Sequence, residues 1–170
     1  MTQAKANAIL YLSIPIVLVI YEMKITKKGQ YALRAMFEVA HRNRQEPLSA
    51  HDIAKSQGIS TRFIEIILND LKTAGFVISM RGSEGGYLLA KDASRITVGQ
   101  IIEVVQGPIL IAPAENGGQV PSSHFGDAAF EKLWSDINSA VSKVFFQTTL
   151  ADMIATELTQ QGKSMLNYMI

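Results

Sequence analysis

The stretch FVISMRGSEGGYLLA, residues 76–90, holds two short apolar segments on either side of a turn that contains three glycines. Residues 76–80 and 87–90 have the β-branched, aromatic and aliphatic composition of strands, and the glycines between them favour a turn. The pattern therefore predicts a β-hairpin with Arg81 at its exposed tip. Such a tip adds nothing to a hydrophobic core, which raises the question of what the arginine contacts.

Two predicted helices precede this hairpin. The sequence SAHD, residues 49–52, has the spacing of a helix N-terminal cap and begins a short helix that Gly58 ends. A second helix follows over residues 61–74 and is closed by Gly75. Two helices joined by a short turn containing glycine form a helix-turn-helix. The apolar residues of the second helix share one face: Phe63, Ile64, Ile67, Leu68 and Leu71.

A further amphipathic helix, from Thr26 to about residues 41–44, comes before this pair. A helix, a helix-turn-helix and a hairpin in this order form a winged helix. In such a domain the second helix of the pair, which Ser60 is expected to cap, places side chains in the major groove of DNA. The hairpin reaches the adjacent minor groove, where the phosphates attract a cation such as Arg81. A plain glycine turn with a solvated arginine is the alternative, and the neighbouring helix-turn-helix disfavours it.

Charge is divided unevenly along the chain. Residues 23–95 hold 12 Lys and Arg against 7 Asp and Glu, whereas residues 96–170 hold 3 against 7. A basic half beside an acidic half predicts that the first half meets a polyanion. The predicted DNA-contacting residues are Lys27, Lys28, Tyr31, Ser49, Ser60, Thr61, Arg62, Glu65, Arg81 and Gly82.

The second half of the chain begins with a short helix over residues 96–108, capped by Thr97, and a loop over residues 109–125. From about Asp127 apolar residues recur at alternating spacings of four and three, which is a heptad seam. The seam predicts a homodimer interface, with burial against the chain's own domain as the alternative. Its residues are Phe130, Trp134, Ile137, Val141, Val144 and Thr148.

The opening MKITKKGQYALRAMFEVA, residues 23–40, and the segment from Leu48 to Ala90 together resemble the Rrf2 family of bacterial transcription regulators. The likeness extends from Met23 to about Ile154. It implies a cytoplasmic regulator, a repressor that dimerises through its long helix and binds a palindromic operator in double-stranded DNA. Family members commonly read DNA with a Glu-Gln pair in the recognition helix; Glu65 matches the first residue, and Ile66 replaces the second.

Many Rrf2 proteins hold an iron–sulfur cluster on three cysteines in the loop before the dimerisation helix. This chain has no cysteine, so the resemblance implies a cluster-free member without a cofactor, responding to a small molecule or a partner protein. No metal site is predicted, because His124 has only Glu115 and Asp127 near it in sequence and a surface histidine is favoured. The three histidines lie in unrelated elements and no nucleophile or phosphate-binding motif is present, so an enzyme is not expected.

The N-terminal residues 1–22 contain an apolar run over residues 8–21 that Pro15 interrupts. The run is short for a membrane span and lacks the flanking features of a secretory signal, so neither a membrane protein nor a secreted one is expected. The remaining readings are an extension upstream of a functional start at Met23, which we favour, and a β-prone arm that packs on the domain.

The predicted fold class is mainly α with a small β-hairpin wing: a winged helix-turn-helix followed by a long C-terminal dimerisation helix. The expected organisation is an N-terminal extension, a DNA-binding domain, a connector helix with an effector-region loop, dimerisation helices restarted by a cap at Thr149, and an unassigned tail. Their ranges are 1–22, 23–95, 96–125, 126–158 and 159–170. The alternative function is a winged-helix module that contacts only protein.

Overall fold

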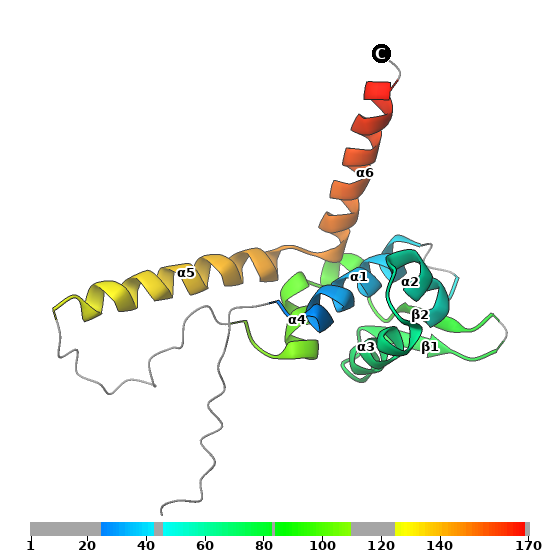
Figure 1. Ribbon diagram of the computed structural model, residues 1–170, viewed down its shortest axis with the longest axis horizontal. Helices are drawn as coiled ribbons and strands as arrows, with labels where there is room; N and C mark the ends of the chain where they lie inside the picture. Colours follow the sequence, from blue (N-terminus) through cyan, green and yellow to red (C-terminus); the bar gives the residue numbers. More distant parts are fainter. Residues whose placement is uncertain (1–24, 43–45, 83, 110–124, 169–170) are drawn as a thin grey trace, which may run out of the picture.

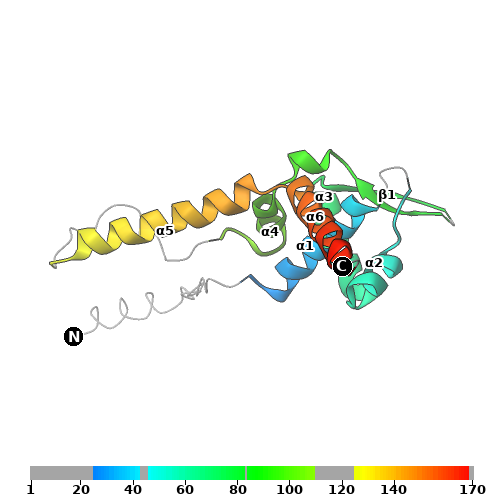
Figure 2. The same cartoon turned by 90° about the horizontal axis from the view of Figure 1, so that it is seen from above.

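The computed structural model describes residues 25–42, 46–82, 84–109 and 125–168 (Figure 1). The N-terminal extension over residues 1–22 and nearly all of the effector-region loop lie outside the described residues, and the predictions for them remain predictions. In two perpendicular views, the hairpin and the long helix α5 project from opposite ends of a small helical body (Figures 1 and 2).

Three helices make up the first part of that body: α1 (Lys27–His41), α2 (Ala50–Gln57) and α3 (Thr61–Thr73). Each helix turns its apolar stripe inward, as the helical spacing predicts. The large side chains that these helices bury completely are Met36, Ile53, Ile64, Ile67, Leu68 and Leu71.

The caps of α2 and α3 differ. Ser49 Oγ accepts a hydrogen bond from the backbone N–H of Asp52 at 3.1 Å, which confirms the predicted cap of α2. Ser60 occupies the N-cap position of α3, but its side chain makes no capping hydrogen bond. The backbone explains this difference from the prediction, because the carbonyl of Ser60 already accepts the N–H of Phe63 at 3.0 Å. The cap of α3 is therefore formed by the main chain.

The wing consists of the antiparallel strands β1 (Val77–Met80) and β2 (Gly86–Leu89), with Ser79 opposite Tyr87. A third segment joins it, because Leu48 exchanges two backbone hydrogen bonds with Tyr87, at 3.0 and 2.9 Å. This bridge brings the backbone before α2 so close to β2 that a Cβ atom on Gly86 would lie 2.6 Å from the Leu48 carbonyl oxygen. Gly86 thus allows the wing to dock on the helical body.

A 3₁₀ turn η1 (Ala93–Arg95) leads from the wing to α4 (Val98–Gln106), which has the predicted cap at Thr97. The C-terminal end of α4 is tied to the start of α1. Both the backbone N–H and the hydroxyl of Thr26, the N-cap residue of α1, donate to Gln106 Oε1 at 2.9 Å. The connector helix is therefore part of the same packed body as the helix-turn-helix.

Two helices complete the chain: α5 (Asp127–Gln147) and α6 (Leu150–Tyr168). Their junction is anchored in the body, because Leu150 is fully buried and its N–H donates to the carbonyl of Ile96 at 2.9 Å. Thr149 and Asp152 form the predicted cap of α6. The hydroxyl and the backbone N–H of Thr149 both donate to Asp152, at 2.6 and 2.9 Å, and hold the pKa of that carboxyl below its usual value.

Helix α6 continues to Tyr168, whereas the sequence predicted an end near Leu158 and an unassigned tail. Gly162 lies inside the helix. A glycine costs an exposed helix only about 1 kcal/mol relative to alanine, so one glycine after two glutamines does not stop it. Among the described residues, no helix is long and apolar enough to cross a membrane.

Candidate nucleic-acid interface

The outward face of α3 is formed by four residues that the helix repeat places together: Arg62, Glu65, Ile66 and Asn69. All four are exposed, and with Asp70 they line a shallow groove along the helix. The opposite face is locked into the core, so the helix presents these side chains in a fixed orientation. Arg62 and Glu65 are among the residues predicted to contact DNA; Asn69 is not, although its spacing of seven from Arg62 puts it on the same face.

The first turn of α3 is partly enclosed. Ser60 is exposed, but Thr61 is only partly so. The ring of Phe63 meets the ring of Tyr31 edge-on, with centroids 5.7 Å apart and planes at 87°. Tyr31 therefore supports the recognition helix from α1, while its own side chain remains partly accessible.

The two lysines at the start of α1 differ in what they contact. Lys28 Nζ donates to Asp70 Oδ2 at 2.6 Å, and this partly exposed ion pair ties α1 to α3. Lys27 is exposed, with no salt bridge to the described part of the chain. Lys28 therefore lies beside α3, near the C-terminal end of that helix, where Asp70 is found.

Ser49 lies at the start of α2, where its hydroxyl is occupied by the helix cap. It accepts from the N–H of Asp52 and donates to the carboxylate of the same residue at 2.6 Å. Ser49 is partly exposed, so it lies at the surface. Its hydroxyl is already used in the two hydrogen bonds that cap α2.

The wing tip holds Arg81 in solvent, as the sequence predicts. Gly82 has a φ of 119°, which side chains rarely adopt, and Gly85 closes the turn through its N–H bond to the Gly82 carbonyl at 3.0 Å. A Cβ on Gly85 would lie 2.6 Å from the Met80 carbonyl oxygen. Gly82 and Gly85 are therefore needed for the backbone conformation of the narrow tip that carries Arg81.

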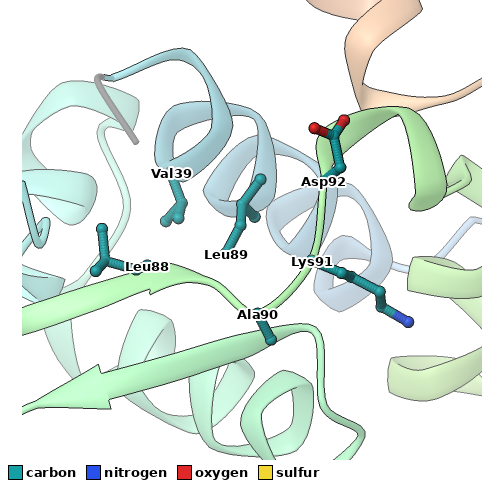
Figure 3. Close-up of a pocket in the computed structure, with 6 residues that line it drawn as sticks. All are labelled: Val39, Leu88, Leu89, Ala90, Lys91 and Asp92. Atoms are coloured by element: carbon teal, nitrogen blue, oxygen red, sulfur yellow. The ribbon is translucent and has the colours of Figure 1, made fainter. Parts of the chain in front are cut away.

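A small pocket lies at the base of the wing, between the end of β2 and α1 (Figure 3). Val39, Leu88 and Leu89 supply its apolar side chains. Its two charged residues serve the fold: Lys91 Nζ lies 4.2 Å from the ring centroid of Phe76, and Asp92 caps η1 through the N–H of Ser94. Both charged side chains of the pocket are therefore engaged in contacts within the fold.

Helix α5 buries none of its residues within the described chain. In its seam, Phe130 and Val144 are 60% and 65% exposed, Trp134 is also exposed, and Ile137 and Val141 are half-buried. Within the described residues, the seam is therefore not buried in the chain's own domain. At the C-terminal end of α5, the face opposite the seam does pack on the body, because the ring of Phe146 fills the space beside Gly99 of α4.

No cluster of three or more His, Asp or Glu side chains suited to a metal occurs among the described residues. His41 stacks on Phe37 with ring centroids 5.9 Å apart, and His51 lies in α2. His124 and Glu115 fall outside the described residues, so the prediction that His124 is a surface histidine is not tested.

Comparison with known proteins gives a consistent result. The Rrf2 family profile, described as an iron-dependent transcriptional regulator, matches residues 25–156. The HTH-type transcriptional regulator CymR of Bacillus subtilis is 37% identical over 131 residues, which cover 77% of this chain and 89% of CymR. The HTH-type transcriptional regulator IscR of Serratia proteamaculans is 35% identical over 137 residues, which cover 78% of this chain and 79% of IscR.

Solved structures agree with these sequence relatives. The structure of CymR, the global cysteine regulator of B. subtilis, superposes with a TM-score of 0.67 at 35% identity, covering 78% of this chain and 97% of CymR. IscR of T. potens gives a TM-score of 0.62 at 31% identity, covering 79% of this chain and 88% of that protein. These likenesses confirm the predicted fold class, mainly helical with a two-stranded wing and a long C-terminal helix.

Proposed function

Because this chain belongs to the Rrf2 family of HTH-type transcriptional regulators and is not an enzyme, we propose that it is a homodimeric repressor that reads a palindromic operator. In this proposal α3 enters the major groove and the wing tip reaches the adjacent minor groove of each half-site. The protein acts in the cytoplasm.

The observation that carries the proposal is the outward face of α3. Its exposed residues have no role in the core, and they include a cation, a carboxylate and an amide, which together can recognise different base edges. Lys27 and Arg81 are exposed in the same basic half of the chain and supply phosphate contacts. In this proposal Ser60, Thr61 and Tyr31 contact DNA at the first turn of α3, and Ser49 and Gly82 add contacts from the start of α2 and from the wing tip.

The homodimer is supported by the seam of α5. Along this seam, apolar side chains remain accessible in the described part of the chain: Phe130, Trp134 and Val144 are exposed, and Ile137 and Val141 are half-buried. A second copy of the same helix has the matching heptad repeat and excludes water from both stripes. Two recognition helices then address two half-sites.

An iron–sulfur cluster does not fit this chain, even though the family profile is described as iron-dependent. Clusters are held by thiolates, and the sequence has no cysteine. We therefore assign the response of this regulator to a small molecule or to a partner protein rather than to a cluster.

The test is selection of DNA by the purified protein. Genomic DNA of the source organism is fragmented, bound fragments are sequenced, and each is measured against a nonspecific DNA of equal length. We expect fragments with an inverted repeat that bind at least about a thousandfold more tightly than the control at physiological salt. Equal affinity for every DNA would overturn sequence-specific recognition, and no binding to any DNA would favour the alternative of a winged-helix module that contacts only protein.

A further inference from the structure

Ile66 is the one large apolar residue on the outward face of α3, and 46% of it is exposed. The other isoleucines of the helix, Ile64 and Ile67, are completely buried. The neighbours of Ile66 on the outward face, Arg62, Glu65 and Asn69, all carry hydrogen-bonding groups. An aliphatic side chain thus stands in the middle of a polar surface that faces away from the core.

The base edges of the major groove restrict what such a side chain can contact favourably. Nearly every group there is a hydrogen-bond donor or acceptor, and covering one with an aliphatic group removes its water without replacing the hydrogen bond. The exception is the 5-methyl group of thymine, which is itself apolar. Packing against that methyl removes apolar surface of both partners from water.

We propose that Ile66 is a specificity-determining residue that selects thymine in each half-site by contact with its 5-methyl group. The proposal rests on the function proposed above, because it needs α3 in the major groove. Glu65 is adjacent, and its carboxylate can accept only from a base donor such as the cytosine amino group. The pair therefore favours half-sites that contain both a cytosine and a thymine.

Ile66 can be tested without disturbing the fold, since it makes no part of the buried core. The operator is first obtained from the genomic selection, and each thymine of one half-site is then replaced by deoxyuridine, which lacks only the methyl group. Dissociation constants are measured for the wild type, Ile66→Ala, Ile66→Val and Ile78→Ala. Ile78 is a matched control, because it is also isoleucine and is 50% exposed, but lies on β1.

For the wild type, deoxyuridine at one thymine of the half-site should weaken binding about fourfold, the value of one buried methyl group. Ile66→Ala should bind the thymine and deoxyuridine sites equally, while Ile66→Val and Ile78→Ala should keep the preference. If no fragment is bound above the nonspecific control, the proposed function fails. If an operator is found but no thymine is sensitive, or Ile66→Ala keeps the full sensitivity, the assignment of Ile66 alone is overturned.

Discussion

The ring of Tyr31 in α1 lies edge-on to the ring of Phe63 in the first turn of α3, with centroids 5.7 Å apart. Phe63 lies on the side of α3 that faces α1. The contact with Tyr31 therefore fixes the position of the first turn of α3 relative to α1. The sequence placed Tyr31 among residues that meet DNA. In the fold the ring of Tyr31 holds α3, the proposed DNA-reading helix, in position.

The two roles of Tyr31 can be separated by substitution. Tyr31→Phe keeps the ring contact, so the free energy of unfolding should be unchanged, while loss of the hydroxyl should weaken operator binding by about 0.5–1.5 kcal/mol. Tyr31→Ala also removes the ring pair and should lower the free energy of unfolding by at least about 1 kcal/mol. Denaturant unfolding and titration of labelled operator measure the two effects. An unchanged affinity of the phenylalanine variant would leave Tyr31 with the structural role only.

Arg81→Ala should weaken operator binding by about 1–3 kcal/mol and leave the thermal unfolding midpoint unchanged. The arginine is exposed at the tip and contributes nothing to the core. Arg95→Ala is the matched control, since Arg95 is an exposed arginine in η1, outside the helix-turn-helix and the wing. Similar losses for the two variants would mean that Arg81 acts only through net charge.

Local signals in the sequence were sufficient for most of the helices. The caps of α2 and α6 are formed by residues three positions apart, Ser49 with Asp52 and Thr149 with Asp152. Helix α4 begins after its cap residue Thr97 and ends before Gly107, as predicted. The helical spacing also identified which face of α3 is buried. Caps and helical spacing depend only on residues that are close together in the sequence, so they can be predicted from the sequence alone.

Contacts between distant residues could not be predicted in this way. The bridge from Leu48 to Tyr87 and the ion pair from Lys28 to Asp70 join residues about forty positions apart, and neither has a local pattern. These contacts change the description of the site: Lys28 is already paired, and Gly86 serves the docking of the wing. The length of α6 was underestimated because residues 159–170 have no clear apolar repeat, although glutamine favours a helix and one glycine costs only about 1 kcal/mol.

Glu65→Ala should alter sequence preference more than overall affinity. A carboxylate repels phosphate and contributes favourably only by accepting from a base, so its removal should relax the requirement at one position of each half-site by about 1–3 kcal/mol. Selection from a randomised operator library, repeated with the variant, reports the change. If the variant binds all DNA more tightly without a change of preference, Glu65 is a repulsive bystander.

Gly86→Ala should destabilise the domain by about 1–3 kcal/mol, because the new Cβ would meet the Leu48 backbone at 2.6 Å. The strain falls on the bridge between Leu48 and Tyr87. Gly162→Ala is the matched control: no atom lies within 4 Å of its Cβ position, and alanine favours the helix. Gly162→Ala should therefore not lower the free energy of unfolding, which denaturant titration of both variants measures.

The double variant Ile137→Glu, Val141→Glu should convert the dimer to a monomer. Both residues belong to the apolar seam of α5, and two unpaired carboxylates buried there should raise the dimer dissociation constant by at least about a hundredfold, equivalent to about 3 kcal/mol. Sedimentation should show the monomer, and cooperative binding to a palindromic operator should be lost. Thermal unfolding should still show the folded wing domain, whose core contains neither residue.

The control for this variant is Ser135→Glu, Ser139→Glu. These residues are exposed and lie on the side of α5 that faces away from the seam, so the same added charge should leave the dimer intact. The comparison separates a specific interface from general charge repulsion, because both variants change the net charge equally. A seam variant that stays dimeric, or that binds the full operator as tightly as the wild type while monomeric, would contradict the role proposed for α5. Dissociation of both variants would instead mean that the interface covers more of the helix than its heptad stripe.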